Sequence, residues 1–172
     1  MWKLIVALLV LTSGALYAAI VTTDQKQARE MVREKANSVF LTSDWPSCEA
    51  TYREVVKSEP KNSEAWFRIA LAVHYQNRFE EAIEGFEKAQ ALGYKRALCN
   101  YNIACGYARL DQPDQALKFL KIALQEGMFG AEQVRSDADF KSLHSDPRFE
   151  SLVSELGKDK DTGVVIIQPD SR

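Results

Sequence analysis

Apolar residues recur at helical spacing between Ser63 and Leu92, in two groups separated by a short polar segment. The segment Gln76-Asn77-Arg78 reads as a turn between two helices, because the apolar pattern stops on one side of it and resumes on the other. The first stripe consists of Trp66, Ile69, Ala70 and Val73, and the second of Ala82, Ile83, Phe86 and Ala89. Neither helix can hide its stripe alone, so the pattern predicts a helical hairpin that packs against neighbours.

The hairpin pattern repeats along the chain at a constant interval. A forward shift of 34 places Ala82 on Ala116 and Phe86 on Leu120, and a backward shift by the same amount places Phe86 on Tyr52. We therefore expect three copies, over residues 29–62, 63–96 and 97–130. The predicted fold class is all-α: a solenoid of helical hairpins in which each copy contacts its neighbours.

The residue types at these repeating positions resemble those of the tetratricopeptide repeat (TPR) family. The middle copy carries the family's large and small residues at the expected places: Trp66, Ala70, Phe79, Ala82, Phe86 and Ala89. The third copy keeps Ala104, Tyr107, Ala116 and Ala123 but has Asn100 in place of the tryptophan, and the more divergent first copy keeps Ala36, Trp45, Tyr52 and Pro60.

After Gly130 this periodicity is lost. Two short apolar stretches follow, and Ser145-Asp146-Pro147 between them reads as a helix start with a capping side chain and a proline in the first turn. We expect residues 131–156 to form capping helices over the open face of the last repeat, like the segment that follows the repeats in many bacterial TPR proteins. Residues 157–172 are expected to be a flexible tail, in which Val164 to Ile167 could add a strand to a partner's sheet.

The first residues have the layout of an export signal. Lys3 precedes an apolar block from Leu4 to Leu11, and small residues such as Ser13 and Ala15 follow. Residues 1–19 are therefore expected to be either a cleaved signal peptide or an N-terminal membrane anchor, since Leu4 to Val21 is close to the shortest length that spans a bilayer. Both alternatives predict a protein that is periplasmic or secreted, or held in the membrane by this segment.

Composition and charge narrow the classes of function. With 22 basic and 24 acidic residues the chain lacks the net positive charge typical of nucleic-acid-binding proteins. It has no GxSxG, HExxH or glycine-rich phosphate loop, so we expect no enzymatic activity and no cofactor.

The three cysteines are Cys48, Cys99 and Cys105. An odd count and the lack of CxxC or CxxxH spacing predict neither a disulfide framework nor a metal site. Cys48 occupies the small position held by Ala82 and Ala116 in the other copies, which favours a packing role. A thiol-based redox or metal role for Cys99 and Cys105 is the alternative.

The resemblance implies a concave groove, lined by the first helix of each repeat, that binds protein or peptide partners. Aromatic residues and arginines, which are common at binding hot spots, dominate the positions expected to line it. These positions are Arg33, Asn37 and Phe40 in the first repeat; Phe67, Arg68, Leu71, His74 and Tyr75 in the second; and Tyr101, Asn102, Cys105 and Arg109 in the third. Arg33 and Asn37 resemble the start of the carboxylate clamp of some TPR proteins, but Leu98 and Asn102 replace its later basic pair, so the clamp is incomplete.

The sequence therefore predicts a scaffold that binds a partner segment on its concave face, outside the cytoplasm. The alternative is a membrane-tethered assembly or spacer component that acts through its anchor and tail. The identity of the partner and the oligomeric state are left open.

Overall fold

The computed structural model describes residues 23, 25–28, 30–127 and 129–156, and within them all regular structure is helical. The expected leader and the expected tail lie outside these residues. A helix over residues 30–40 comes first. It is followed by α2 (Trp45–Ser58), α3 (Ser63–Tyr75), α4 (Phe79–Ala91), α5 (Arg96–Arg109), α6 (Pro113–Gln125), α7 (Ala131–Ser136), the 3₁₀ helix η1 (Ala138–Leu143) and α8 (Pro147–Leu156).

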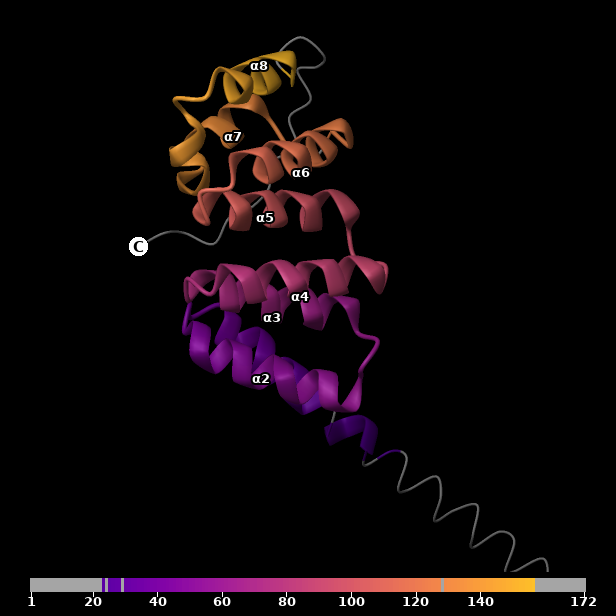
Figure 1. Ribbon diagram of the computed structural model, residues 1–172. Helices are drawn as coiled ribbons and strands as arrows, with labels where there is room; N and C mark the ends of the chain where they lie inside the picture. The colour runs from indigo at the N-terminus through magenta and orange to yellow at the C-terminus, as the bar shows by residue number, and fades with distance from the viewer. Residues whose placement is uncertain (1–22, 24, 29, 128, 157–172) are drawn as a thin grey trace, which may run out of the picture.

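Consecutive helices pair as antiparallel hairpins, and the hairpins stack along one axis (Figure 1). The predicted all-α array of TPR-like hairpins with a helical cap is thereby confirmed. Among the described residues, no helix is both long and apolar enough to cross a membrane.

The turn inside each hairpin has the same backbone geometry. Ser43, Asn77 and Asp111 occupy equivalent positions of the three repeats, and all adopt a left-handed conformation, with φ of 56°, 61° and 56°. In the second and third hairpins the amide after this residue donates back to a carbonyl of the preceding helix, from Arg78 to Val73 and from Gln112 to Tyr107. This pattern satisfies carbonyls that the helix end leaves free.

Small residues allow the helices to approach closely. A Cβ placed on Gly85 of α4 would lie 2.8 Å from the Cβ of Ala70 of α3. A Cβ on Gly106 of α5 would lie 2.8 Å from a side-chain carbon of Ile83 of α4. The first glycine lets the two helices of one hairpin pack closely, and the second lets neighbouring hairpins stack closely.

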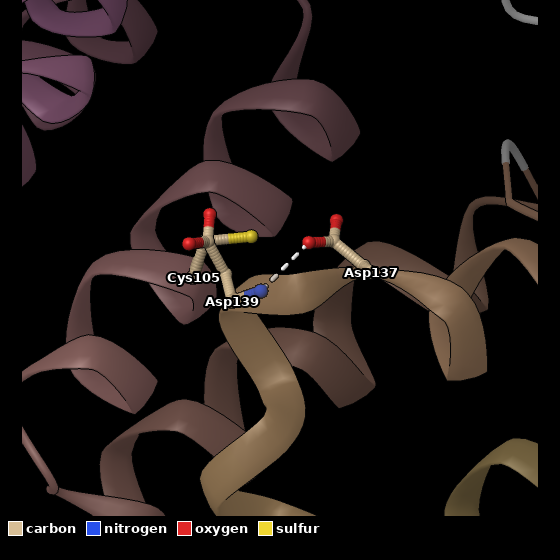
Figure 2. A group of neighbouring side chains, drawn as sticks. All are labelled: Cys105, Asp137 and Asp139. Atoms are coloured by element: carbon tan, nitrogen blue, oxygen red, sulfur yellow. Dashed lines mark hydrogen bonds between the residues drawn. The ribbon is translucent and has the colours of Figure 1, made fainter. Parts of the chain in front are cut away.

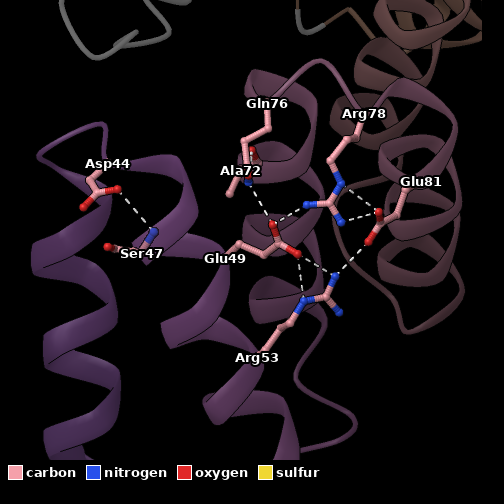
Figure 3. A network of polar contacts seen from close by, with 8 residues as sticks. All are labelled: Asp44, Ser47, Glu49, Arg53, Ala72, Gln76, Arg78 and Glu81. Atoms are coloured by element: carbon pink, nitrogen blue, oxygen red, sulfur yellow. Dashed lines mark hydrogen bonds and ion pairs between the residues drawn. The ribbon is translucent and has the colours of Figure 1, made fainter.

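Glu49 of α2 joins the first two hairpins through a polar network (Figure 3). Its carboxylate accepts hydrogen bonds from Arg53 Nε at 2.9 Å, Gln76 Nε2 at 2.8 Å and Arg78 Nη1 at 2.7 Å. Burial by itself would raise the pKa of Glu49, but these hydrogen bonds outweigh it and hold the pKa below its ordinary value of 4.5. Glu49 is therefore ionised in the folded protein at neutral pH.

We expect Glu49→Gln to lower the free energy of unfolding by about 1–3 kcal/mol at pH 7, because the charged acceptor of three hydrogen bonds is lost. A lowered folded-state pKa contributes stability above the unfolded value of 4.5, and this contribution disappears as the pH falls through the folded-state value. The difference between wild type and variant should therefore be constant near neutrality and vanish in acid. Urea titrations at several pH values measure it; a difference that persists unchanged at pH 3 would contradict the assignment.

The segment after the repeats covers one end of the array. Phe129, Val134, Phe140, Leu143, Phe149 and Val153 are buried in one cluster with residues of α5 and α6. Asp146 Oδ1 accepts from the backbone N–H of Arg148 at 2.9 Å, so the predicted capped start of α8 is confirmed. The stretch around Phe140 and Leu143 is a 3₁₀ helix.

Candidate functional site

The residues predicted to line the groove divide into three groups, the first of which contacts the capping segment. Tyr101 is 6% exposed, stacks on Phe129 with 4.0 Å between ring centroids, and meets Phe140 edge-on at 5.4 Å. Its hydroxyl donates to Asp137 Oδ2 at 2.7 Å. Burial raises the pKa of Tyr101 far above its ordinary value, so the hydroxyl stays protonated and able to donate.

His74 and Arg109 meet the same segment at Asp139. His74 Nε2 lies 2.8 Å from Asp139 Oδ2, and Arg109 Nη1 donates to Oδ1 at 2.9 Å. Burial alone would raise the pKa of Asp139, but the hydrogen bonds from His74 and Arg109 outweigh it and lower the pKa. The inner face of the third hairpin is thus covered by the chain itself.

The second group takes part in packing or hydrogen bonds within the repeats. Phe67 is 5% exposed and packs between Phe86 and Tyr94, with centroid distances of 5.3 and 4.6 Å. Asn37 Oδ1 accepts from the Tyr52 hydroxyl at 2.7 Å, and Asn102 donates to the Leu98 carbonyl at 2.8 Å.

The third group lies over the first two hairpins and is partly open to solvent. Arg68 lies with its guanidinium carbon 4.2 Å from the centroid of the Phe40 ring. Phe40 meets Trp45 edge-on at 5.8 Å, and Trp45 stacks on Tyr75 with centroids 4.2 Å apart and planes 17° apart. We call Arg68, Phe40, Trp45 and Tyr75 the aromatic row. Tyr75, at its end, is 50% exposed.

Among the described residues, the Arg68 side chain donates one hydrogen bond. Its Nη2 donates to Glu64 Oε1 at 3.2 Å, while its Nε is buried and has no hydrogen-bond partner among the described residues. A guanidinium presents a planar fork suited to a carboxylate. Nearby on the same helix Leu71 is half-buried, and Arg33 on the first helix, over residues 30–40, is half-exposed and paired with Glu59 at 2.7 Å.

Trp45 is the member of the row that the groove prediction missed. In the repeat register it takes the position of Phe79, at the start of the second helix, whereas the groove prediction covers only residues of the first helix of each repeat. Trp45 is only partly buried, and its ring stacks on the half-exposed Tyr75. The sequence feature that could have indicated this role is the position of Trp45 directly after the first turn, next to the ends of the helices that line the groove.

All three cysteines are free and buried. Burial raises the pKa of Cys48 to about 11 and that of Cys99 to about 12, so neither is a reactive thiolate at neutral pH. Cys99 belongs to the core of the first two hairpins, whereas Cys105 belongs to the core beneath the cap. The two thiols therefore face different surroundings, as their spacing of six on one helix predicts.

Comparisons with known proteins agree with this architecture. No family model matches the chain. A protein of Arabidopsis thaliana described as chloroplastic is 27% identical over 139 residues, which cover 78% of this chain and 41% of that protein. The chain thus spans less than half the length of this relative.

A solved chain described as "MamA MSR-1 C2", from a TPR protein, matches with a TM-score of 0.53 at 22% identity. The match covers 56% of each chain, and at this identity it concerns the fold. Together with the hairpin array and the left-handed turns that recur at equivalent positions of the repeats, it shows that the chain has a TPR-like helical repeat fold.

Proposed function

We propose that the protein is a non-catalytic scaffold that binds a segment of a partner protein along the aromatic row. The observation that carries the proposal is Arg68, whose side chain is partly exposed, packs its guanidinium on Phe40 and donates only one side-chain hydrogen bond, at 3.2 Å to Glu64, among the described residues. An acidic side chain of the partner would pair with Arg68. An aromatic or aliphatic side chain would pack on Tyr75, whose ring is already held in place by Trp45.

The covered face of the third hairpin limits where the partner lies. Because Asp137 and Asp139 already pair with Tyr101, His74 and Arg109, we place the partner over the first two hairpins. The ion pair between Arg109 and Asp139 is an example of the interaction proposed for Arg68, because it joins an arginine of the inner face to a carboxylate. Of the other predicted residues, Arg33, Asn37 and Leu71 would border this surface.

From the N-terminal sequence alone we also propose that the protein acts outside the cytoplasm, exported or anchored by residues 1–19. Comparing the intact mass of the protein from the cell envelope with that of the full sequence distinguishes a cleaved signal from an anchor. An unprocessed protein in the soluble cytoplasmic fraction would contradict both.

Binding is tested with peptides selected from a displayed random library on the full chain. We expect the selected peptides to share an acidic residue a few positions from an aromatic or aliphatic one. Arg68→Gln should weaken their binding about tenfold, and Tyr75→Ala by a similar or larger factor, as for residues at the centre of an interface. Fluorescence polarisation with a labelled peptide measures both dissociation constants.

Arg96→Gln is the matched control, because Arg96 is an exposed arginine outside the row. It should leave peptide affinity unchanged, as should deletion of residues 164–172. Peptides without acidic residues, or affinity that survives in the Arg68→Gln and Tyr75→Ala double variant, would refute the row as the site. Loss of affinity on the tail deletion alone would instead favour the anchor-and-tail alternative.

A further inference from the structure

Cys105 and two aspartates converge beneath the cap (Figure 2). Cys105 lies on α5, Asp137 is the N-cap of η1, and Asp139 lies in the first turn of η1. The thiol sulfur and one oxygen of each carboxylate all lie within 4.8 Å of one another. Cys105 is 2% exposed, so a thiol and two carboxylates share one poorly hydrated space.

His74 of α3 contacts one of these two carboxylates. His74 is 4% exposed, and its Nε2 lies 2.8 Å from Asp139 Oδ2. Its Nδ1 is buried and has no hydrogen-bond partner among the described residues. Within that part of the chain, the imidazole therefore hydrogen-bonds only to Asp139. Cysteine, histidine and aspartate from three separate elements thus supply the donor types that bind zinc.

Further hydrogen bonds fix the orientation of both carboxylates. Asp137 accepts from the Tyr101 hydroxyl at 2.7 Å and from the backbone N–H of Asp139 at 3.0 Å, the bond drawn in Figure 2. Asp139 accepts from Arg109 Nη1 at 2.9 Å. Partners of this kind orient the ligands of a metal ion and tune its affinity.

We propose that Cys105, Asp137 and Asp139, with His74 beside Asp139 as a further ligand, form a binding site for a divalent metal ion of the zinc class. Ligand atoms of a tetrahedral zinc site lie roughly 3.3–3.8 Å apart, because the metal–ligand bonds are ~2.0–2.3 Å long. Movements of about 1 Å would therefore bring the ligand atoms of Cys105, Asp137 and Asp139, which lie within 4.8 Å of one another, around an ion. On binding, the thiol proton leaves to solvent and the thiolate forms the metal–sulfur bond; a soft thiolate disfavours magnesium and calcium.

The ion would join three elements that are distant in the sequence. It would bridge α3, α5 and η1, and so fasten the capping segment to the inner face of the second and third hairpins. The site shares no residue with the aromatic row, and the two meet where the Tyr75 ring lies edge-on to His74, with centroids 5.9 Å apart.

The test uses the full chain without a purification tag, reduced with a non-chelating phosphine, and titrated with Co²⁺ and then Zn²⁺. We expect one Co²⁺ per chain with a sulfur-to-cobalt charge-transfer band, and displacement of that band by Zn²⁺. With free Zn²⁺ at a hundred times the dissociation constant, the folding equilibrium constant should rise about 100-fold, measured by urea unfolding.

Cys105→Ser should abolish the charge-transfer band, and Asp139→Asn and His74→Gln should each weaken binding at least tenfold. Cys99→Ser is the matched control, since Cys99 is also buried on α5 but lies in the other core, and it should leave the band intact. If Cys105→Ser does not fold, Asp137→Asn keeps the proposal testable, because it should weaken Co²⁺ binding at least tenfold while retaining the thiol; unchanged affinity in that variant would overturn the proposal. Absence of the band in the wild type, or its persistence in Cys105→Ser, would overturn the proposal.

Discussion

Replacing Phe140 with alanine is expected to lower the free energy of unfolding by about 3–5 kcal/mol, the range for large-to-small changes at buried aromatic positions. Phe140 is fully buried and contacts the rings of Tyr101 and Phe149. Its loss leaves a cavity between η1, α5 and α8 that the short 3₁₀ helix is poorly placed to fill. Urea denaturation followed by circular dichroism measures the change.

The position of Phe140 also predicts where the loss appears. Hydrogen exchange should accelerate in η1, α8 and the inner face of α5, while α2 and α3 keep most of their protection, because stability in a repeat array is carried by contacts between neighbours. Ser142→Ala serves as the control, since it removes one hydrogen bond to the Ala108 carbonyl and no apolar packing. A loss below about 1 kcal/mol for Phe140→Ala would show that the cap contributes little to the fold.

Phe86→Ala is expected to cost a similar amount, about 3–5 kcal/mol, but to affect the chain more widely. Phe86 is fully buried in the core shared by the first two hairpins and packs on Phe67. Because this core also contains Cys99 and Ile103 of α5, the central hairpin links both ends of the array. Its disruption should accelerate hydrogen exchange in α2, α3, α4 and α5 together.

Glu87→Ala is the neighbouring control for Phe86→Ala. Glu87 is exposed on the same helix, so its replacement should change the free energy of unfolding by less than about 0.5 kcal/mol. If Phe86→Ala instead released only α4, the first two hairpins would not behave as one cooperative unit. Hydrogen exchange resolved by segment distinguishes the two outcomes.

The sequence was most informative where the fold depends on short-range pattern. The spacing of apolar residues predicts that Phe86 and Ala70 are buried. Turn and capping residues predict the turn at Asn77 and the capped start of α8. These features are repeated or local, so the periodicity of the chain and its turn residues were sufficient to predict them.

The candidate site was only partly predictable, because it depends on how the cap folds back. Counting positions along α5 places Tyr101 on the inner face, but not beneath Phe129 and Phe140. Similarly, no spacing rule connects Cys105 with Asp137 and Asp139, which follow only after α6 and α7. Contacts between segments without a shared period are set by tertiary packing alone.

The contact between His74 and Asp139 joins residues 65 positions apart, whereas the stacked hairpins pack mainly against their neighbours along the chain. During synthesis the first two hairpins can therefore form while the cap is still inside the ribosome, because contacts of short sequence separation close quickly. Until Asp139 emerges, the nascent chain presents His74, Tyr101 and Arg109 uncovered. The final step of folding is then the docking of the capping segment onto a surface that the earlier hairpins have already formed.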